Sequence, residues 1–575
     1  MPWLTVAGLL LLVLLGAFLR LHNLGRQSVS HVEMYVPGIR LPHGISVPEE
    51  RLGMVKVVTS TLNSDTHPPA YYVLMWVWTK IFGASARSIR LPSALFGIAS
   101  IPLMFWLGVM TDQAKAGWIA AALLAINGHQ IFWSQVARMF TLSCFLGLLA
   151  TIFLLKLARQ NHTSRWLKLS YVGVLLFGLC THLFFWLILA SQILWTAANA
   201  WRERQPMPAM LRLQLVAAIL GSPLLAFSAY QTGNTLATLS SNTLVYAREF
   251  VQFALAFPLL GFSSGLYRNY GAIPENNPHL SLARWLFLGL SLILFVAGCG
   301  AAPKSRKKLL LDAHGPSLRL WLWAGALGTF SILAFIWVAR SFAHPSATLR
   351  NTERMIAVPF ILAIAAILIE KNWAKLSSCT FRLVHNPLVS GEQGLMVILA
   401  TVPLLLLAII SLGKPILNAR GMLLLAPYLL LLLSAGIVRL GRNPIVLTVL
   451  LLAVGAAQFI GLRQYSGMTT GRADYKSLAA ALVPQVENAD LVFLHPEFYS
   501  TPLFFDMNSG WSHFVGRDYD KATRNHPHAR VWALWFYNYE PELPAAIQAS
   551  LANYQRAETI EVAGGQAILY LPKSQ

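Results

Sequence analysis

The chain has 575 residues, of which 56% are hydrophobic and 12% are charged, and its mean hydropathy is +0.56. Soluble domains carry about a quarter charged residues, so this composition excludes a soluble globular protein and indicates a polytopic membrane protein. A formal net charge of +21 is typical of cytoplasmic loops that face anionic lipid, and we therefore expect no nucleic-acid partner.

Apolar runs along the chain predict an all-α transmembrane domain. The run at residues 3–19 lacks a basic start and a small-residue cleavage site, so we interpret it as an anchor rather than a removed signal peptide. Since a spanning helix needs about 20 apolar residues, the sequence predicts about 13 transmembrane helices. They lie at residues 3–19, 91–110, 117–131, 139–155, 169–180, 183–200, 213–230, 282–299, 320–338, 355–369, 395–412, 422–438 and 444–459.

The apolar run at residues 69–82 does not fit this series. Basic residues of short loops stay on the cytoplasmic side, and counting 69–82 as a span would invert that bias. We therefore predict a shorter helix in the outer leaflet, with Tyr71, Tyr72, Trp76 and Trp78 as interfacial anchors. The N-terminus is then cytoplasmic, whereas the first outer loop (residues 23–90) and the tail are extracytoplasmic. Residues 251–260 are apolar but too short to cross, and predict a second interfacial piece.

After residue 460 the composition changes to that of a soluble domain. The pattern predicts helices at residues 474–486 and 541–551, buried strands at 491–494 and 531–536, and a hairpin from 559–562 and 566–571. The expected organisation is a transmembrane domain at residues 1–460 followed by a small extracytoplasmic α/β domain at residues 461–575. No Gly-rich phosphate loop occurs in this tail.

Glu33 is the first catalytic candidate. It lies beside His31 in a loop between apolar helices, where a carboxylate that faces an open chamber can take a proton from an attacking hydroxyl. Glu33→Gln is then expected to abolish activity and to leave the fold intact. The alternative is a solvated loop carboxylate without a role.

Asp65 and His67 precede two prolines, which stiffen the backbone and fix the direction of neighbouring side chains. Asp65 is a second candidate base. His67 can ligate a metal, bond to a phosphate or act as an acid, and its alternative role is to cap the helix that follows. No cluster has the spacing of a metal site, so no metal ligand is predicted, although use of a divalent metal stays open.

Cations and histidines on the predicted outer side are the candidate substrate ligands. A guanidinium forks onto two phosphate oxygens, and Arg138 and Arg420 each lie at the outer end of a predicted span. His182 lies near the same face, with a hydrogen-bonded structural histidine as the alternative. The residues expected to bind substrate are His31, Tyr71, Arg138, His182, Arg268, Arg350 and Arg420.

Four motifs follow one another in the first part of the chain. They are Gln27-Ser28 with Glu33, Asp65-x-His67-Pro68-Pro69-x-Tyr71-Tyr72, Arg90-Leu91-Pro92-Ser93-Ala94-Leu95-Phe96-Gly97 and Gln135-x-Ala137-Arg138-Met139. In this order they resemble the bacterial branch of the protein O-mannosyltransferase and lipid A aminoarabinose transferase superfamily, which is glycosyltransferase family 39-like. Arg420, followed by a helix with Pro427, is similar to a later motif of that family.

The resemblance implies the GT-C architecture and a transfer reaction. A sugar would pass from a polyprenyl-phosphate donor to an acceptor glycan, lipid or protein on the outer side of a bacterial inner membrane. The chain departs from the family at two positions, because Val32 precedes Glu33 where the family has Asp-Glu, and Val136 stands at an often acidic position. A transporter or flippase of lipid-linked intermediates and a non-catalytic scaffold derived from the family are the alternative functions.

Overall fold

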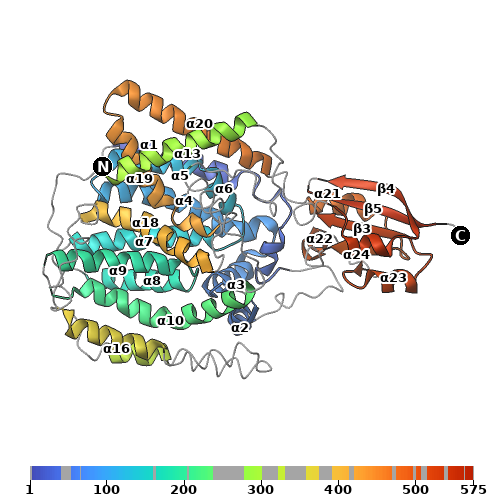
Figure 1. The fold of residues 1–575 in the computed structure, drawn as a ribbon, viewed down its shortest axis with the longest axis horizontal. Coiled ribbons are helices and arrows are strands. Elements are labelled where there is room, and N and C mark those ends of the chain that lie inside the picture. Colours follow the sequence, from blue (N-terminus) through green and yellow to red (C-terminus); the bar gives the residue numbers. More distant parts are fainter. Residues whose placement is uncertain are drawn as a thin grey trace.

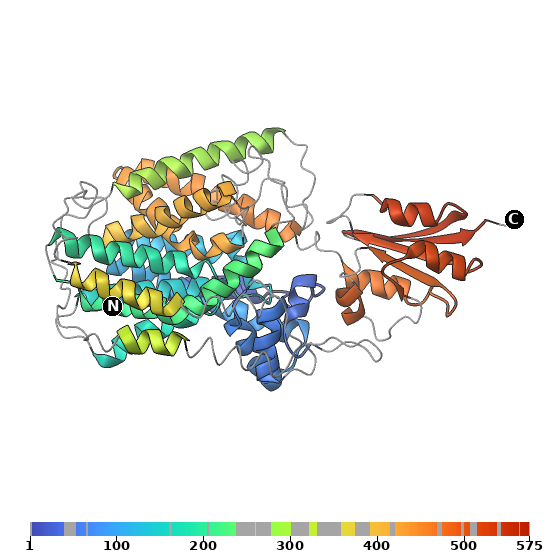
Figure 2. The ribbon, with the colours of Figure 1, turned by 60° about the horizontal axis from the view of Figure 1, so that its bottom comes forward.

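The protein is described by a computed structural model with two lobes, one helical and one built on a β-sheet (Figures 1 and 2). The described residues are 3–39, 53–64, 67–159, 164–203, 206–236, 259, 278–300, 321–329, 358–373, 391–413, 420–468, 474–495, 500–506, 514–536, 542–562 and 564–573.

Long apolar helices form the helical lobe (Figure 1). They are α1 (Trp3–Leu21), α4 (Ala86–Met110), α5 (Ala114–Ile126), α7 (Phe140–Arg159), α8 (Arg165–Leu179), α9 (Phe185–Arg202), α10 (Ala209–Leu236), α13 (Pro278–Cys299), α16 (Val358–Lys371), α18 (Gly391–Gly413), α19 (Ala426–Leu440) and α20 (Pro444–Met468). Among the described residues, five helices are long and apolar enough to cross a membrane, namely α1, α4, α7, α18 and α20. With the composition, these helices define a multi-pass membrane protein.

Two of the expected spans are interrupted. The run at residues 117–131 divides into α5 and α6 (Gly128–Ser134) at Asn127, whose backbone is extended and whose side chain accepts a hydrogen bond from Gln130 N at 3.1 Å. The run at residues 422–438 begins with the 3-10 turn η6 (Gly421–Leu424), and Pro427 lies in the first turn of α19. Hydropathy does not reveal such breaks, because one Asn as an N-cap or one Pro in a first turn barely changes the average.

The first outer loop contains three short helices: η1 (His31–Tyr35), α2 (Met54–Ser64) and α3 (Ala70–Phe82). With 13 residues, α3 is too short to span, as expected. Interfacial anchoring is wrong for Tyr71 and Tyr72, which are buried because α3 packs against α2 and α4. The interfacial piece expected at residues 251–260 lies outside the described residues, apart from residue 259.

Helices α13 and α19 approach each other closely through two glycines. A Cβ at Gly298 would collide with the main-chain oxygen of Leu432, and a Cβ at Gly436 would collide with that of Leu294. Small residues allow such backbone contact between membrane helices.

Gly436→Val is therefore expected to destabilise the protein by about 1–3 kcal/mol or more, because the added side chain forces α13 and α19 apart. Thermal unfolding of purified protein in detergent measures the change. Gly455→Val in α20 is the matched control, since no atom lies within 4 Å of a Cβ built at Gly455. An equal effect of the two substitutions would contradict the proposed contact.

The C-terminal lobe contains a five-stranded sheet with the strand order β2-β1-β3-β5-β4. Its strands are β1 (Leu491–His495), β2 (Phe514–Val515), β3 (Val531–Phe536), β4 (Tyr554–Val562) and β5 (Gly565–Pro572), and its helices are α21 (Tyr475–Leu482), α22 (Ser500–Asp506), α23 (Tyr519–Asn525) and α24 (Ala545–Ser550). Strand β1 is parallel to β2 and β3, whereas β5 is antiparallel to β3 and β4.

This sheet confirms the small C-terminal sheet predicted from the tail. The strands expected at residues 491–494 and 531–536 coincide with β1 and β3, and the expected hairpin coincides with β4 and β5. All six residues of β3 are buried, because α-helices cover both faces of the sheet. Helix α20 continues to Met468, beyond the domain boundary expected at residue 460.

Candidate functional site: a cluster of cations and histidines

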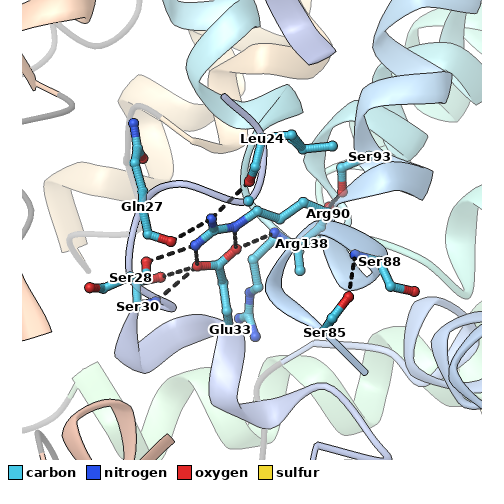
Figure 3. A network of polar contacts seen from close by, with 12 residues as sticks. Leu24, Gln27, Ser28, Ser30, Glu33, Ser85, Ser88, Arg90, Ser93 and Arg138 are labelled. Carbon is cyan, nitrogen blue, oxygen red and sulfur yellow. Dashed lines mark hydrogen bonds and ion pairs between the residues drawn. The ribbon is translucent and has the colours of Figure 1, made fainter. Parts of the chain in front are cut away.

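A buried ion pair joins the first outer loop to α4 (Figure 3). Arg90 donates from Nε and Nη2 to the two carboxylate oxygens of Glu33, each at 2.8 Å. Its other N–H groups reach the main-chain oxygens of Leu24 and Gln27, both at 3.0 Å, and of Ser28 at 2.8 Å. All five N–H groups of the guanidinium are therefore bonded, and the side chain is 1% exposed.

Glu33 accepts three further hydrogen bonds in the same place. The main-chain N–H and the hydroxyl of Ser30 both donate at 2.9 Å, and the Ala137 N–H donates at 2.9 Å. The expectation that Glu33 faces an open chamber is wrong, since its side chain is 0% exposed. Arg90 is the reason, because a charge in an apolar helix requires a buried partner. Glu33 has to release Arg90 before it can take a proton from a substrate.

Arg138 lies next to this pair, in the turn between α6 and α7, and follows Ala137, whose N–H donates to Glu33. Its Nη1 donates to the Tyr72 hydroxyl at 2.7 Å and to the Val32 main-chain oxygen at 3.3 Å. The Arg138 main-chain oxygen accepts from the Ser93 hydroxyl at 3.1 Å. Nearby, the Gln135 amide donates to three main-chain oxygens at the end of α1, those of residues 19, 20 and 22. The turn is thus fixed to α1, α3 and α4.

His67 and His182 stack on each other, although they come from different loops. Their ring centroids are 5.4 Å apart with an interplanar angle of 26°, and both rings contact Phe140 edge-on. The two loops are joined by a hydrogen bond from Ala70 N to the Cys180 oxygen at 2.9 Å. The alternative role of His67 as a helix cap is wrong, since the N-cap position of α3 is residue 69.

Arg420 approaches the same ring from η6. Its guanidinium carbon lies 5.9 Å from the ring centroid of Phe140, which is the first residue of α7. The positive end of the helix dipole of α7 is therefore at the position where His67, His182 and Arg420 meet. We call His31, His67, Arg138, His182 and Arg420 the cation–histidine cluster.

Burial, and then the neighbouring charges, keep the histidines of the cluster neutral. Burial and then Arg138 lower the pKa of His31 to about 4, and burial, Arg420 and Arg138 lower that of His182 to about 3. Burial, Arg138, His182 and Arg420 lower the pKa of His67 well below its usual value. Each arginine disfavours a further positive charge beside it. The cluster thus holds two permanent cations and three neutral imidazoles.

Two hydroxyl groups at the start of α7 add to this environment. Thr141 and Ser143 are each 1% exposed, and among the described residues their hydroxyls have no hydrogen-bond partner. A buried hydroxyl without a partner costs about 1–3 kcal/mol. Fixed positive charge, a helix N-terminus and free donors together form an environment suited to an anion such as a phosphate.

The structure brings together five of the expected site residues: His31, His67, Arg138, His182 and Arg420. Tyr71 lies beside them, with its hydroxyl 3.5 Å from that of Ser93. The candidates Asp65, Arg268 and Arg350 lie outside the described residues. In the described part of the chain, no three His, Cys, Asp or Glu side chains gather as a metal site requires.

Arg90, Tyr72 and Gln135 are functional neighbours that sequence reasoning did not select. Arg90 and Gln135 were quoted only as parts of motifs, and Tyr72 only as part of a motif and as an interfacial anchor. A usable signal existed for Arg90, because an arginine that opens an apolar run of α4 needs a partner charge. No signal identified Tyr72, since its role depends on the position of Arg138.

The chain is similar to several solved structures, among them the following three. One is ArnT from Cupriavidus metallidurans bound to undecaprenyl phosphate, at 12% identity and a TM-score of 0.34, covering 94% of this chain and 96% of that one. Another is an oligosaccharyltransferase from Archaeoglobus fulgidus, at 11% identity and a TM-score of 0.42, covering 98% of this chain and 73% of that one. The third is the arabinofuranosyltransferase AftD from Mycobacteria, at 11% identity and a TM-score of 0.37, covering 100% of this chain and 42% of that one.

No protein-family profile matches the chain, and no curated protein matches it in sequence. At the identities and TM-scores of the three structures, we transfer no residue role from them to this chain.

Proposed function

We propose that this protein is a GT-C glycosyltransferase that moves a sugar from a polyprenyl-phosphate donor to an acceptor. The reaction takes place on the extracytoplasmic side of a bacterial inner membrane, with the N-terminus in the cytoplasm and the C-terminal domain outside. The order of the four motifs supports this proposal, as does the membrane-embedded helical lobe.

The observation that carries the proposal is the cation–histidine cluster at the start of α7. Its members come from four separate parts of the chain, yet the field of Arg138 acts on all three histidines. Such a convergence of donors, next to helices that cross the bilayer, is suited to a phosphate carried by a lipid. Arg138 and Arg420 stabilise the charge that develops on the phosphate as the sugar leaves.

The acceptor hydroxyl needs a group that takes its proton. Glu33, the candidate from the sequence, is occupied by Arg90, so we propose that it positions the first loop and that His67 takes the proton. A neutral imidazole is able to do so, and a bound phosphate raises its proton affinity by adding negative charge nearby. Asp65 is the second candidate base.

A second function deserves a test because the carboxylate of Glu33 is fully engaged. A protein that binds or transports lipid phosphates without transfer needs the cluster but no base. A transporter of lipid-linked intermediates and a non-catalytic scaffold, the two alternatives considered from the sequence, both meet this description.

A reconstituted assay separates these functions. Purified protein in liposomes is given a labelled undecaprenyl-phosphate sugar and candidate acceptors, with and without a divalent metal chelator. Transfer of label that is lost in His67→Asn and kept in His528→Asn supports the proposal. Movement of the labelled lipid across the bilayer without transfer supports a transporter, and binding alone supports a scaffold.

Lipid-anion binding is expected to strengthen as the pH falls. Without an anion the histidines of the cluster are neutral above about pH 4, because burial is the main cause that lowers the pKa of His31 to about 4, of His182 to about 3 and of His67 well below its usual value. A bound anion raises these pKa values. Protonation therefore adds affinity below the pKa of the complex, and this gain is lost as the pH rises through that value. The gain is up to about tenfold per pH unit for each proton taken up.

A long-chain alkyl sulfate is the suitable probe, because its charge is constant between pH 7 and pH 5. Its affinity is measured by titration calorimetry in detergent. The slope of the logarithm of affinity against pH is expected to decrease in His31→Asn. It is expected to be unchanged in His528→Asn, because His528 is exposed on the C-terminal domain. A flat profile in the unmodified protein would contradict the predicted coupling.

A further inference from the structure

Five consecutive main-chain oxygens of the first outer loop, those of residues 24–28, accept hydrogen bonds from two cationic side chains. Arg90 of α4 donates hydrogen bonds to the oxygens of residues 24, 27 and 28. The ammonium group of Lys476 donates hydrogen bonds to the oxygens of residues 25 and 26, at 3.1 Å and 3.4 Å. We call residues 24–28 the carbonyl segment.

Lys476 belongs to the C-terminal domain, in the first turn of α21. Its main-chain N–H also donates to the Ser28 hydroxyl at 3.0 Å. The next residue back, Tyr475, packs its ring on Phe536 at the end of β3, with 4.9 Å between ring centroids. Helix α22 of the same domain packs near η1. The carbonyl segment is therefore one place where the C-terminal domain contacts the helical lobe.

A short path leads from Lys476 to the cation–histidine cluster. The carbonyl segment runs directly into η1, which carries His31 and Glu33. The Val32 oxygen in η1 accepts from Arg138, and Arg90 bonds both the segment and Glu33. Displacement of the carbonyl segment therefore moves the Val32 oxygen, which accepts a hydrogen bond from Arg138.

We infer that Lys476 is a positioning residue and that the C-terminal domain is part of the machinery of the site. Lys476 donates hydrogen bonds to the two main-chain oxygens that Arg90 does not reach, so that residues 24–33 stay in one conformation. This inference rests on the proposed function for its effect on substrate, but its structural part is independent of any activity. Hydrogen bonds to a charged group contribute more than neutral ones, which gives one side chain this influence.

Hydrogen–deuterium exchange of the full-length protein in lipid nanodiscs tests the structural part. Lys476→Met keeps the apolar stem and removes the ammonium group, and it is expected to speed exchange of the amides of residues 24–36 about tenfold. Lys476→Arg restores a cation and is expected to restore most of the protection. Lys521→Met, on exposed α23 of the same domain, is the matched control and is expected to leave residues 24–36 unchanged.

The effect on substrate is measured with the same variants. The apparent Kd for undecaprenyl phosphate is expected to rise about tenfold in Lys476→Met, with Lys476→Arg intermediate. Unchanged exchange at residues 24–36 in Lys476→Met overturns the inference, whatever the activity. Faster exchange with an unchanged Kd overturns its link to the site. Failure of the unmodified protein to bind undecaprenyl phosphate counts against the proposed function and leaves the exchange test intact.

Discussion

Glu33→Gln is expected to destabilise the folded protein by about 3–5 kcal/mol, the cost of leaving a buried charge without its partner. The amide keeps the shape of the carboxylate but turns an N–H group toward donors, since Arg90, Ser30 and Ala137 all donate to Glu33. The variant is therefore expected to unfold at lower temperature, instead of being a folded protein without activity as the sequence alone suggested.

Thermal or denaturant unfolding in detergent measures this loss, with Glu558→Gln on the exposed strand β4 as the matched control. A double-mutant cycle with Arg90→Met identifies the pair, because the double variant no longer contains an uncompensated buried charge. It is expected to be more stable than the sum of the single effects predicts, by up to about 3 kcal/mol. Additive single effects, or a Glu33→Gln protein as stable as the control, would refute the buried pair.

Arg138→Ala is expected to weaken binding of undecaprenyl phosphate by about 1.5–3 kcal/mol, which is roughly a 10- to 100-fold rise in Kd. The substitution removes the cation whose field acts on all three histidines of the cluster. Arg138→Lys keeps the charge but loses the planar fork, so an intermediate Kd is expected.

Binding in nanodiscs measures this effect, and Arg165→Ala is the matched control because Arg165 is an exposed arginine at the start of α8. Tyr72→Phe separates orientation from charge, since it removes the 2.7 Å hydrogen bond and keeps the guanidinium. A Kd for Arg138→Ala equal to that of the unmodified protein would remove Arg138 from the site.

The helices of this protein were largely predictable because a bilayer imposes a length and a composition on every span. The breaks between helices were not predictable, since Asn127 interrupts an apolar run without changing its mean hydropathy. The short helices α22 and α23 were not predicted for a different reason. Helices of seven residues show too little periodicity to be recognised, and their stability comes from packing on the sheet.

The sequence singled out the members of the cluster one at a time, Arg138 and Arg420 as cations at the ends of predicted spans and the histidines as titratable groups of loops. The hydrogen-bond partners of the site residues could not be predicted in this way. The exposed loop expected around Glu33 became a buried one because Arg90 lies 57 positions away in sequence and meets it only in the folded chain. Periodicity and charge counting carry no information on such distant pairs, so the sequence indicated a polar loop around Glu33 and gave the wrong exposure for that side chain.

The amide of Gln135, bonded to the last main-chain oxygens of α1, also ties the turn between α6 and α7 to the end of a helix long and apolar enough to cross a membrane. Helix α1 presents large apolar side chains to its surroundings along most of its length, so the thickness of the hydrocarbon layer fixes its vertical position. Because the turn that carries Arg138 is tied to the end of this helix, the height of the guanidinium above the bilayer midplane follows from the apolar length of α1.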